Sequence, residues 1–322
     1  MSTRKLLASF LLLGAPALAQ PGQLSGPVAG YVYDRTAAAL RPVRGVPGAA
    51  TLGDRLAVPF ALEAGFVGSR QDLAVLVATD GTTHWFTLSG NAATEVAATG
   101  SIATPRRVVF SPSGTAAALV ASDSVQVVTG LPSSPALAGS VALDAATAAA
   151  VSVHSSAGWL AVSDDGVWLL LATENGLRLA AVAGGSSNSL MPIGQSGVVA
   201  FAPGSHDAAI STGGVLTWIH DAAGSAVQQA VAQNAALARA VGVAFSADSA
   251  TLYAANAAGS IWSFDLAAGT SVQQSSDALA TGLEPMGGFL RLNQAGRGPV
   301  WLIDPNAGSP RVFFVPPAVT SN

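Results

Sequence analysis

The chain has 322 residues, of which 50% are hydrophobic and only 10% are charged, and its formal net charge is −4. It contains no cysteine, which excludes disulfides, thiol nucleophiles and thiolate metal sites. Lys5 is the only lysine and Arg106-Arg107 is the only adjacent arginine pair, so the clustered cations of a nucleic-acid-binding or anionic-membrane surface are missing.

The first residues have the pattern of a secretory signal peptide. Arg4 and Lys5 precede an apolar run over residues 6–13, and Ala17-Leu18-Ala19 supplies small residues for signal peptidase. The run is too short to cross a bilayer as a helix. We therefore expect residues 1–19 to be removed and the rest to be exported, to a periplasm or out of the cell, as a monomer that does not insert into a membrane.

Apolar runs separated by turn residues predict strands along the rest of the chain. Residues 73–78 form such a run before Thr79-Asp80-Gly81, and a second run follows; an Asp-Gly pair between apolar runs is a strong hairpin signal. The same order returns in residues 167–180, 208–218, 252–264 and 300–315. Trp85, Trp218 and Trp262 stand at similar places after their turns, so we expect them to pack between neighbouring sheets.

These hairpins belong to a repeat of about 45 residues, in which an apolar strand ends in a turn rich in Ser, Asp and Gly. The six turns begin at Val67, Phe110, Val162, Phe201, Phe245 and Leu292. Strand-turn-strand units of this period are typical of propeller blades. We predict an all-β fold with a single β-propeller over residues 20–315 and a disordered tail over residues 316–322.

The repeat resembles that of the bacterial exported YVTN/WD40-like β-propellers, in which Phe-Ser-Pro-Asp-Gly closes the innermost strand of each blade. The best copies are residues 110–114 and 162–166, and the repeat covers residues 60–315. The Gly-His and Trp-Asp dipeptides of eukaryotic WD40 repeats are absent. The resemblance implies a fold and says little about function.

The number of blades follows from the turns. Six inner-strand turns favour six blades. Residues 30–34 and 40–43 look like outer strands without an inner pair, and the resemblance implies that such an N-terminal strand completes the last blade and closes the ring. The alternative is a seventh blade hidden in residues 28–60 or in the 52-residue interval that follows Phe110.

No group of side chains in the sequence indicates catalysis, a metal site or a cofactor. The histidines, His84, His154, His206 and His220, are not spaced as a metal-binding pair and occupy different places in the repeat. Asp164-Asp165-Gly166 lacks the alternating oxygen ligands and the distal Glu of a calcium loop, and is better explained as a turn. A nucleophile elbow and a phosphate loop are both missing. We expect no cofactor and no metal.

The favoured function is that of an exported, non-catalytic scaffold that binds a protein or a carbohydrate on one face. A closed ring is a rigid platform whose loops can vary without unfolding it. The resemblance implies that the binding face is built from the loops that enter the inner strands and those that link second to third strands. These loops carry six candidate binding residues: Asp80, His84, Arg107, Glu174, Arg239 and Glu284.

Two other functions compete with this one. A six-bladed, lactonase-like or esterase-like hydrolase would hold a divalent cation where acidic and amide side chains converge at the channel mouth. Glu63, Asn256, Glu284 and Asn293 are the available residues, but the small number of acidic residues argues against this enzyme. The last alternative is a structural module that assembles with its own copies or with a surface complex, and the low charge favours self-association.

Overall fold

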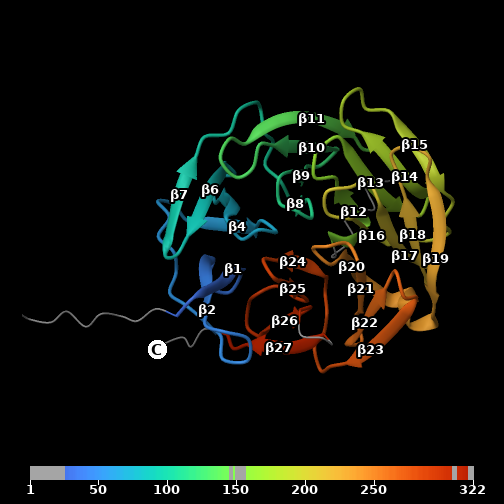
Figure 1. Cartoon of the computed structure of the whole chain (residues 1–322). Helices are drawn as coiled ribbons and strands as arrows, with labels where there is room; N and C mark the ends of the chain where they lie inside the picture. Colours follow the sequence, from blue (N-terminus) through green and yellow to red (C-terminus); the bar gives the residue numbers. More distant parts are fainter. Residues whose placement is uncertain (1–25, 145–147, 149–156, 307–309, 318–322) are drawn as a thin grey trace, which may run out of the picture.

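The computed structural model describes residues 26–144, 148, 157–306 and 310–317. Its strands form seven antiparallel sheets, which stand side by side around a central channel as the blades of a propeller (Figure 1). We name them sheets A to G in chain order. The prediction of a single all-β propeller is confirmed, whereas the prediction of six blades is wrong. The seventh blade is formed by residues 28–52, inside the segment that the alternative named. The predicted signal peptide lies outside the described residues, as does most of the predicted tail.

Sheets B to G have four strands each, which follow one another from the channel outward. Sheet B contains β4 (Leu62–Val67), β5 (Leu73–Ala78), β6 (Thr83–Ser89) and β7 (Ala92–Val96). Sheet C contains β8 (Arg107–Phe110), β9 (Ala117–Val120), β10 (Ser124–Thr129) and β11 (Ala136–Ala142). Sheet D contains β12 (Leu160–Val162), β13 (Trp168–Thr173), β14 (Gly176–Ala181) and β15 (Ser187–Met191), after a short helix, η1 (Ala157–Trp159).

The remaining four-stranded sheets have the same order. Sheet E contains β16 (Val198–Phe201), β17 (Ala208–Thr212), β18 (Val215–His220) and β19 (Val227–Gln233). Sheet F contains β20 (Ala240–Phe245), β21 (Thr251–Asn256), β22 (Ser260–Asp265) and β23 (Thr270–Ser275), after the short helix η2 (Ala235–Arg239). Sheet G contains β24 (Glu284–Met286), β25 (Phe289–Arg291), β26 (Val300–Asp304) and β27 (Arg311–Val315). Among the described residues, no helix is long and apolar enough to cross a membrane.

The sequence of each strand matches its place in the blade. The second strand is covered on both faces by neighbouring blades, so β5 reads Leu-Ala-Val-Leu-Val-Ala and is buried at every position. The outermost strand meets solvent, and β23 reads Thr-Ser-Val-Gln-Gln-Ser with almost every residue exposed. Burial therefore falls from the second strand to the rim.

Sheet A is a blade without an innermost strand. It contains β1 (Val28–Asp34), β2 (Ala39–Arg44) and β3 (Thr51–Leu52). β1 is mostly buried, as the second strands of other blades are, and β2 has the same burial pattern as β14, a third strand. In the part of the chain that the structure describes, no strand pairs with the channel side of β1.

The ring closes between sheets A and G without a shared strand. All four strands of sheet G come from residues 284–315, so the expectation that an N-terminal strand completes the last blade is wrong. The two sheets are instead joined by an apolar cluster that includes Val32, Val43, Met286, Val300 and Leu302. Side-chain packing, rather than strand exchange, joins the first blade to the last.

The blade count was wrong because sheet A has no innermost strand and therefore no inner turn to count. A second error, which did not change the count, concerns the turn at residues 292–296. It links β25 to β26, the second and third strands of sheet G, and is not an inner-strand turn. The inner turn of this sheet is Gly287-Gly288, which carries none of the Ser and Asp residues of the repeat. The match at residue 292 was therefore out of register with the other repeats by one strand.

Each pair of neighbouring sheets shares one apolar cluster of buried side chains. Trp85 is buried in the cluster between sheets B and C, and Trp262 is buried in the one between sheets E and F. Trp218 is partly buried and packs against the latter cluster. The prediction that these tryptophans pack between blades is confirmed.

The inner-strand turns also bind one another across neighbouring blades. The hydroxyl of Ser69 in sheet B donates to the carbonyl of Ser111 in sheet C, at 2.8 Å. The carboxylate of Asp164 in sheet D accepts from the backbone N–H of Ser113 in sheet C and from that of Gly204 in sheet E, both at 2.8 Å. Asp164 therefore connects three consecutive blades, which gives this turn a structural role.

Replacing Asp164 with Ala should destabilise the ring. The substitution removes the acceptor of two backbone N–H groups in different blades, which should cost about 1–3 kcal/mol in the free energy of unfolding. Thermal unfolding measured by circular dichroism should show a fall in Tm of roughly 2–4 °C per kcal/mol lost. The matched control is Asp277→Ala, which removes an exposed carboxylate. An equal Tm for the two variants would contradict the role of Asp164.

Asp165 makes a second, pH-dependent contact in the same turn. Its carboxylate accepts from the Ser163 hydroxyl at 2.5 Å and from the backbone N–H of Val167 at 3.0 Å, and lies 2.9 Å from Nε2 of His206 in sheet E. Burial alone would raise the pKa of Asp165, but these hydrogen bonds outweigh it, so the pKa lies below its ordinary value. The ionised form is therefore the one that the fold stabilises.

Replacing Asp165 with Asn should lower the Tm at pH 7 and not at low pH. A carboxyl whose pKa is lowered by folding contributes stability above its unfolded-state pKa of about 4, and that contribution disappears as the pH falls through the folded-state pKa. Thermal unfolding from pH 7 to about pH 2 should show the difference between wild type and Asp165→Asn shrinking below about pH 4. A difference that stays constant over this range would contradict the assignment.

Candidate functional site

The candidate binding residues lie at one end of the ring. Because adjacent strands of a blade run in opposite directions, the loops that enter the inner strands and the turns that link second to third strands share that end. We call this end the entry face. It carries all six residues that the sequence predicted: Asp80, His84, Arg107, Glu174, Arg239 and Glu284.

Asp80 and His84 are brought together at the β5–β6 turn of sheet B. The hydroxyl of Thr82 donates to the Asp80 carboxylate at 2.6 Å and lies 2.9 Å from Nε2 of His84. Nδ1 of His84 lies 2.7 Å from a carboxylate oxygen of Glu95, and its ring stacks on Phe60 with centroids 4.2 Å apart. Hydrogen bonds from the hydroxyl and backbone N–H of Thr82 lower the pKa of Asp80. This network orders the turn.

Glu174 and Arg239 do not join the other candidates. Glu174 lies in the β13–β14 turn of sheet D, and Arg239 is the last residue of η2, before sheet F. Both side chains are exposed, and sheet E lies between their blades. They are separate charged positions on the entry face.

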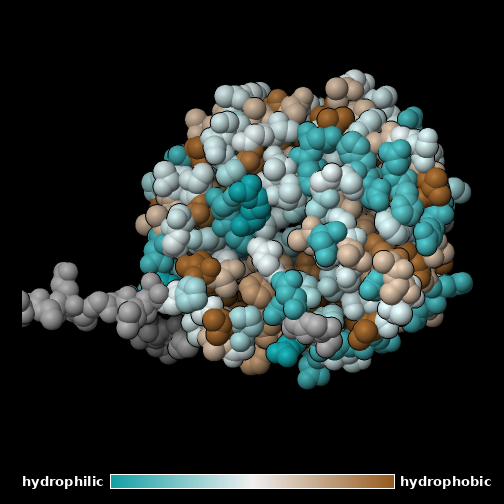
Figure 2. All heavy atoms as spheres, in the orientation of Figure 1, coloured by the Kyte–Doolittle hydropathy of each residue, from teal (hydrophilic) through white to brown (hydrophobic). Residues whose placement is uncertain are grey.

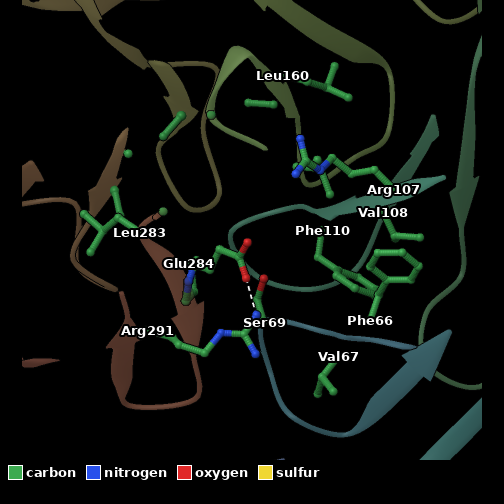
Figure 3. A pocket seen from close by; sticks show the side chains of 18 of the residues that line it. Phe66, Val67, Ser69, Arg107, Val108, Phe110, Leu160, Leu283, Glu284 and Arg291 are labelled. Carbon is green, nitrogen blue, oxygen red and sulfur yellow. Dashed lines mark hydrogen bonds and ion pairs between the residues drawn. The ribbon is translucent and has the colours of Figure 1, made fainter. Parts of the chain in front are cut away.

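Arg107 and Glu284 line the same cavity. Each is the first residue of an inner strand, β8 and β24 respectively, so both side chains lie at the entry-face end of the channel. The cavity has a volume of about 470 Å³ and is lined by the inner strands of sheets B to G. Figure 3 shows Arg107 extending from one wall, while Glu284 and Arg291 lie together on the opposite wall.

The cavity has more cationic than anionic side chains. Four arginines and two glutamates line it: Arg35, Arg106, Arg107, Arg291, Glu63 and Glu284. The side chain of Arg291 is only 10% exposed and forms an ion pair with Glu284, which neutralises the most deeply buried of these arginines. Arg35, Arg106 and Arg107 also line the cavity, and Glu63 is its second carboxylate.

Arg107 is the arginine most affected by its surroundings. Burial lowers its pKa, the charge of Glu284 raises it, and the charge of Arg35 lowers it further, so that the pKa lies below its ordinary value. Arg107 and Arg35 therefore repel each other across the cavity, although they come from blades that are not adjacent. The cavity concentrates positive charge in a chain whose net charge is negative.

The missing strand of sheet A shapes this cavity. Tyr33 lies in β1, which has the second position in its blade, and Arg35 directly follows that strand. Both residues nevertheless line the channel. The hydroxyl of Tyr33 donates to the carbonyl of Glu63 at 2.9 Å, and its ring covers Gly65 so closely that a Cβ there would lie 2.7 Å from it. Without an inner strand in front of β1, residues that other blades bury instead reach the channel.

The residues named for a metal-dependent hydrolase do not converge. Glu63 and Glu284 line the cavity, but Asn256 and Asn293 order their own turns. Asn256 accepts from the backbone N–H of Ala258 and of Ser260, and Asn293 donates to the carbonyl of Pro299. Among the described residues, no group of three or more His, Asp or Glu side chains is placed to hold a metal ion.

The sequence named part of this cavity and missed the rest. Arg107, Glu284 and Glu63 were named, whereas Arg35 and Arg291 were not. Arg291 follows an apolar pair in the misassigned repeat, and Arg35 follows a segment that was taken for an outer strand. The one available signal was the pair Arg106-Arg107 at the start of an inner strand.

Comparisons with known proteins support the fold and not a family. No protein-family model matches the chain, and no curated protein matches it. A protein of unknown function from Desulfotomaculum acetoxidans is 12% identical with a TM-score of 0.58, over 90% of this chain and 100% of that one. Sqt1 of Saccharomyces cerevisiae is 12% identical with a TM-score of 0.54, over 92% of this chain and 90% of that one. At these identities the likeness shows the propeller fold alone.

The surface seen along the ring axis is mixed in character. Figure 2 shows hydrophilic residues over much of this side, with apolar residues scattered among them. Exposed large apolar side chains belong to separate blades, as with Val46, Val167 and Leu279. Scattered apolar residues of this kind are normal on a protein surface. The central cavity is therefore the more distinctive feature.

Replacing Glu284 with Gln should destabilise the fold by leaving the buried guanidinium of Arg291 without its anionic partner. Because Glu284 itself is partly exposed, the loss should be about 1–3 kcal/mol, below that of a fully buried pair. Chemical denaturation measures the loss. The matched control is Glu63→Gln, which removes an exposed carboxylate from the same cavity. Equal stability of the two variants would contradict the importance of the ion pair.

Proposed function

We propose that this protein is an exported, non-catalytic scaffold that binds a protein partner at its entry face. The observation that carries the proposal is the placement of charged loop residues around the mouth of the channel on a ring held by packing between every pair of blades. A rigid ring presents such residues at fixed positions, so that binding costs little loop ordering.

Two further observations support a protein partner. Arg107, Arg239 and Glu174 are distributed over three blades, so a surface of the size of a protein interface is needed to contact them together. Arginine is also enriched among the residues that dominate protein–protein binding energies. The signal-peptide pattern at residues 1–19 supports export.

The test is affinity capture with residues 20–322 as bait in an envelope extract of the source cells, followed by mass spectrometry. One reproducible protein partner is expected. Its affinity for the Arg107→Ala/Arg239→Ala double variant should be at least about tenfold lower, because each arginine at an interface centre contributes more than 1 kcal/mol.

The matched control is Arg311→Ala, which removes an exposed arginine from the start of β27, at the opposite end of the ring. Circular dichroism checks that all variants keep the Tm of the wild type. Equal partner affinity for the double variant and the control would contradict the entry face as the binding surface. Recovery of a glycan instead of a protein would contradict the proposed class of partner.

A further inference from the structure

We propose that the central cavity is a binding site for a small carboxylate whose remaining part is apolar. The proposal concerns a ligand that enters the ring, and it stands apart from a partner that covers the entry face. It is carried by the size of the cavity, its excess of arginine and the arrangement of its apolar wall.

The cavity has the size and the access that such a ligand needs. Its volume of about 470 Å³ lies within the range of roughly 300–1,000 Å³ found for small-molecule sites. Arg35 and Arg106 line the cavity and are also exposed, so it opens to solvent at the entry face. A ligand can therefore enter without a rearrangement of the blades.

The charge of the wall favours an anion. Four arginines and two glutamates line the cavity, so its wall has a net positive charge even though Arg291 and Glu284 form an ion pair. Arg107 is partly buried, and its charge is attracted by Glu284 and repelled by Arg35, which lines the same cavity. An anion bound at Arg107 would offset the excess positive charge of the cavity wall, and arginine is well suited to a carboxylate because it can donate two parallel hydrogen bonds. The two glutamates that line the same cavity disfavour a dianionic phosphate.

The apolar residues fix where the rest of the ligand lies. Arg107 begins β8 and Phe110 ends it, so about 10 Å along the channel separates the guanidinium end from the aromatic end. Phe66 lines the same space, and Figure 3 shows Phe66 and Phe110 next to each other. A ligand with its carboxylate at Arg107 would place its apolar part against these side chains.

The test uses residues 20–322 and isothermal titration calorimetry with four small probes. They are 3-phenylpropionate, its neutral amide, 3-phenylpropylamine and acetate. We expect 3-phenylpropionate to bind with a Kd of about 1 mM or lower. The amide and the amine, which lack the anion, and acetate, which lacks the apolar part, should bind at least about tenfold more weakly.

Two variants locate the site. Arg107→Gln should weaken binding of 3-phenylpropionate at least tenfold, and Arg35→Gln, at an exposed position, should weaken it severalfold. The control is Arg311→Gln at the opposite end of the ring, which should leave the affinity unchanged. If Arg107→Gln fails to fold, the Arg35→Gln variant still decides the matter.

A peptide arm distinguishes the source of the carboxylate. The tripeptide Gly-Gly-Phe has a carboxylate and a phenyl group at its C-terminal residue, and its C-terminal amide lacks the carboxylate. Tighter binding of the tripeptide than of its amide would extend the site to peptide C-termini. Binding of 3-phenylpropionate without binding of the tripeptide would restrict the site to small carboxylic acids. Equal affinity for acid and amide, no binding of 3-phenylpropionate, or unchanged binding in both arginine variants would overturn the proposal. Arg239 does not line the cavity, so the Arg239→Ala single variant should weaken binding of the entry-face partner and leave binding of 3-phenylpropionate unchanged, which distinguishes the failure of one proposal from the failure of the other.

Discussion

The structure depends above all on apolar packing between neighbouring sheets. Each blade has two faces, and each face is covered only by the blade next to it, so no blade could bury its apolar residues alone. One cluster of buried side chains joins each neighbouring pair, including the first and last blades. Because the chain has no cysteine, this packing holds the ring without the help of disulfides. Turn-to-turn hydrogen bonds such as those of Asp164 add to it at the end opposite the entry face.

The missing innermost strand of sheet A has a consequence for the channel. Sheet A meets its neighbours through β1, which stands where other blades have their second strand. Tyr33 and Arg35 therefore reach the channel and add an aromatic ring and a cation to its wall. The same absence that makes sheet A irregular thus provides part of the arginine-rich cavity. The missing strand therefore accounts both for the irregular blade and for part of the candidate ligand site.

The sequence predicted the fold better than the site. Strand and turn residues are local signals, so Asp80-Gly81 and the turn at residues 162–166 could be located directly. The number of blades could not be predicted, because sheet A lacks an innermost strand and so lacks the inner turn that marks each of the other blades. The cavity depends on contacts between blades far apart in the sequence. The approach of Arg35 to Arg107 is such a contact, and nothing in the spacing of the two residues indicates it.

The most direct test of this account is hydrogen exchange in wild type and in the Leu302→Ala variant. Leu302 is fully buried in the cluster between sheets A and G, and its truncation should cost about 2–5 kcal/mol. If side-chain packing closes the ring, amides in β1 and β2 should lose protection together with those of sheet G, although Leu302 belongs to sheet G alone. Loss of protection confined to sheet G would contradict closure through this cluster, and with it the account of the cavity.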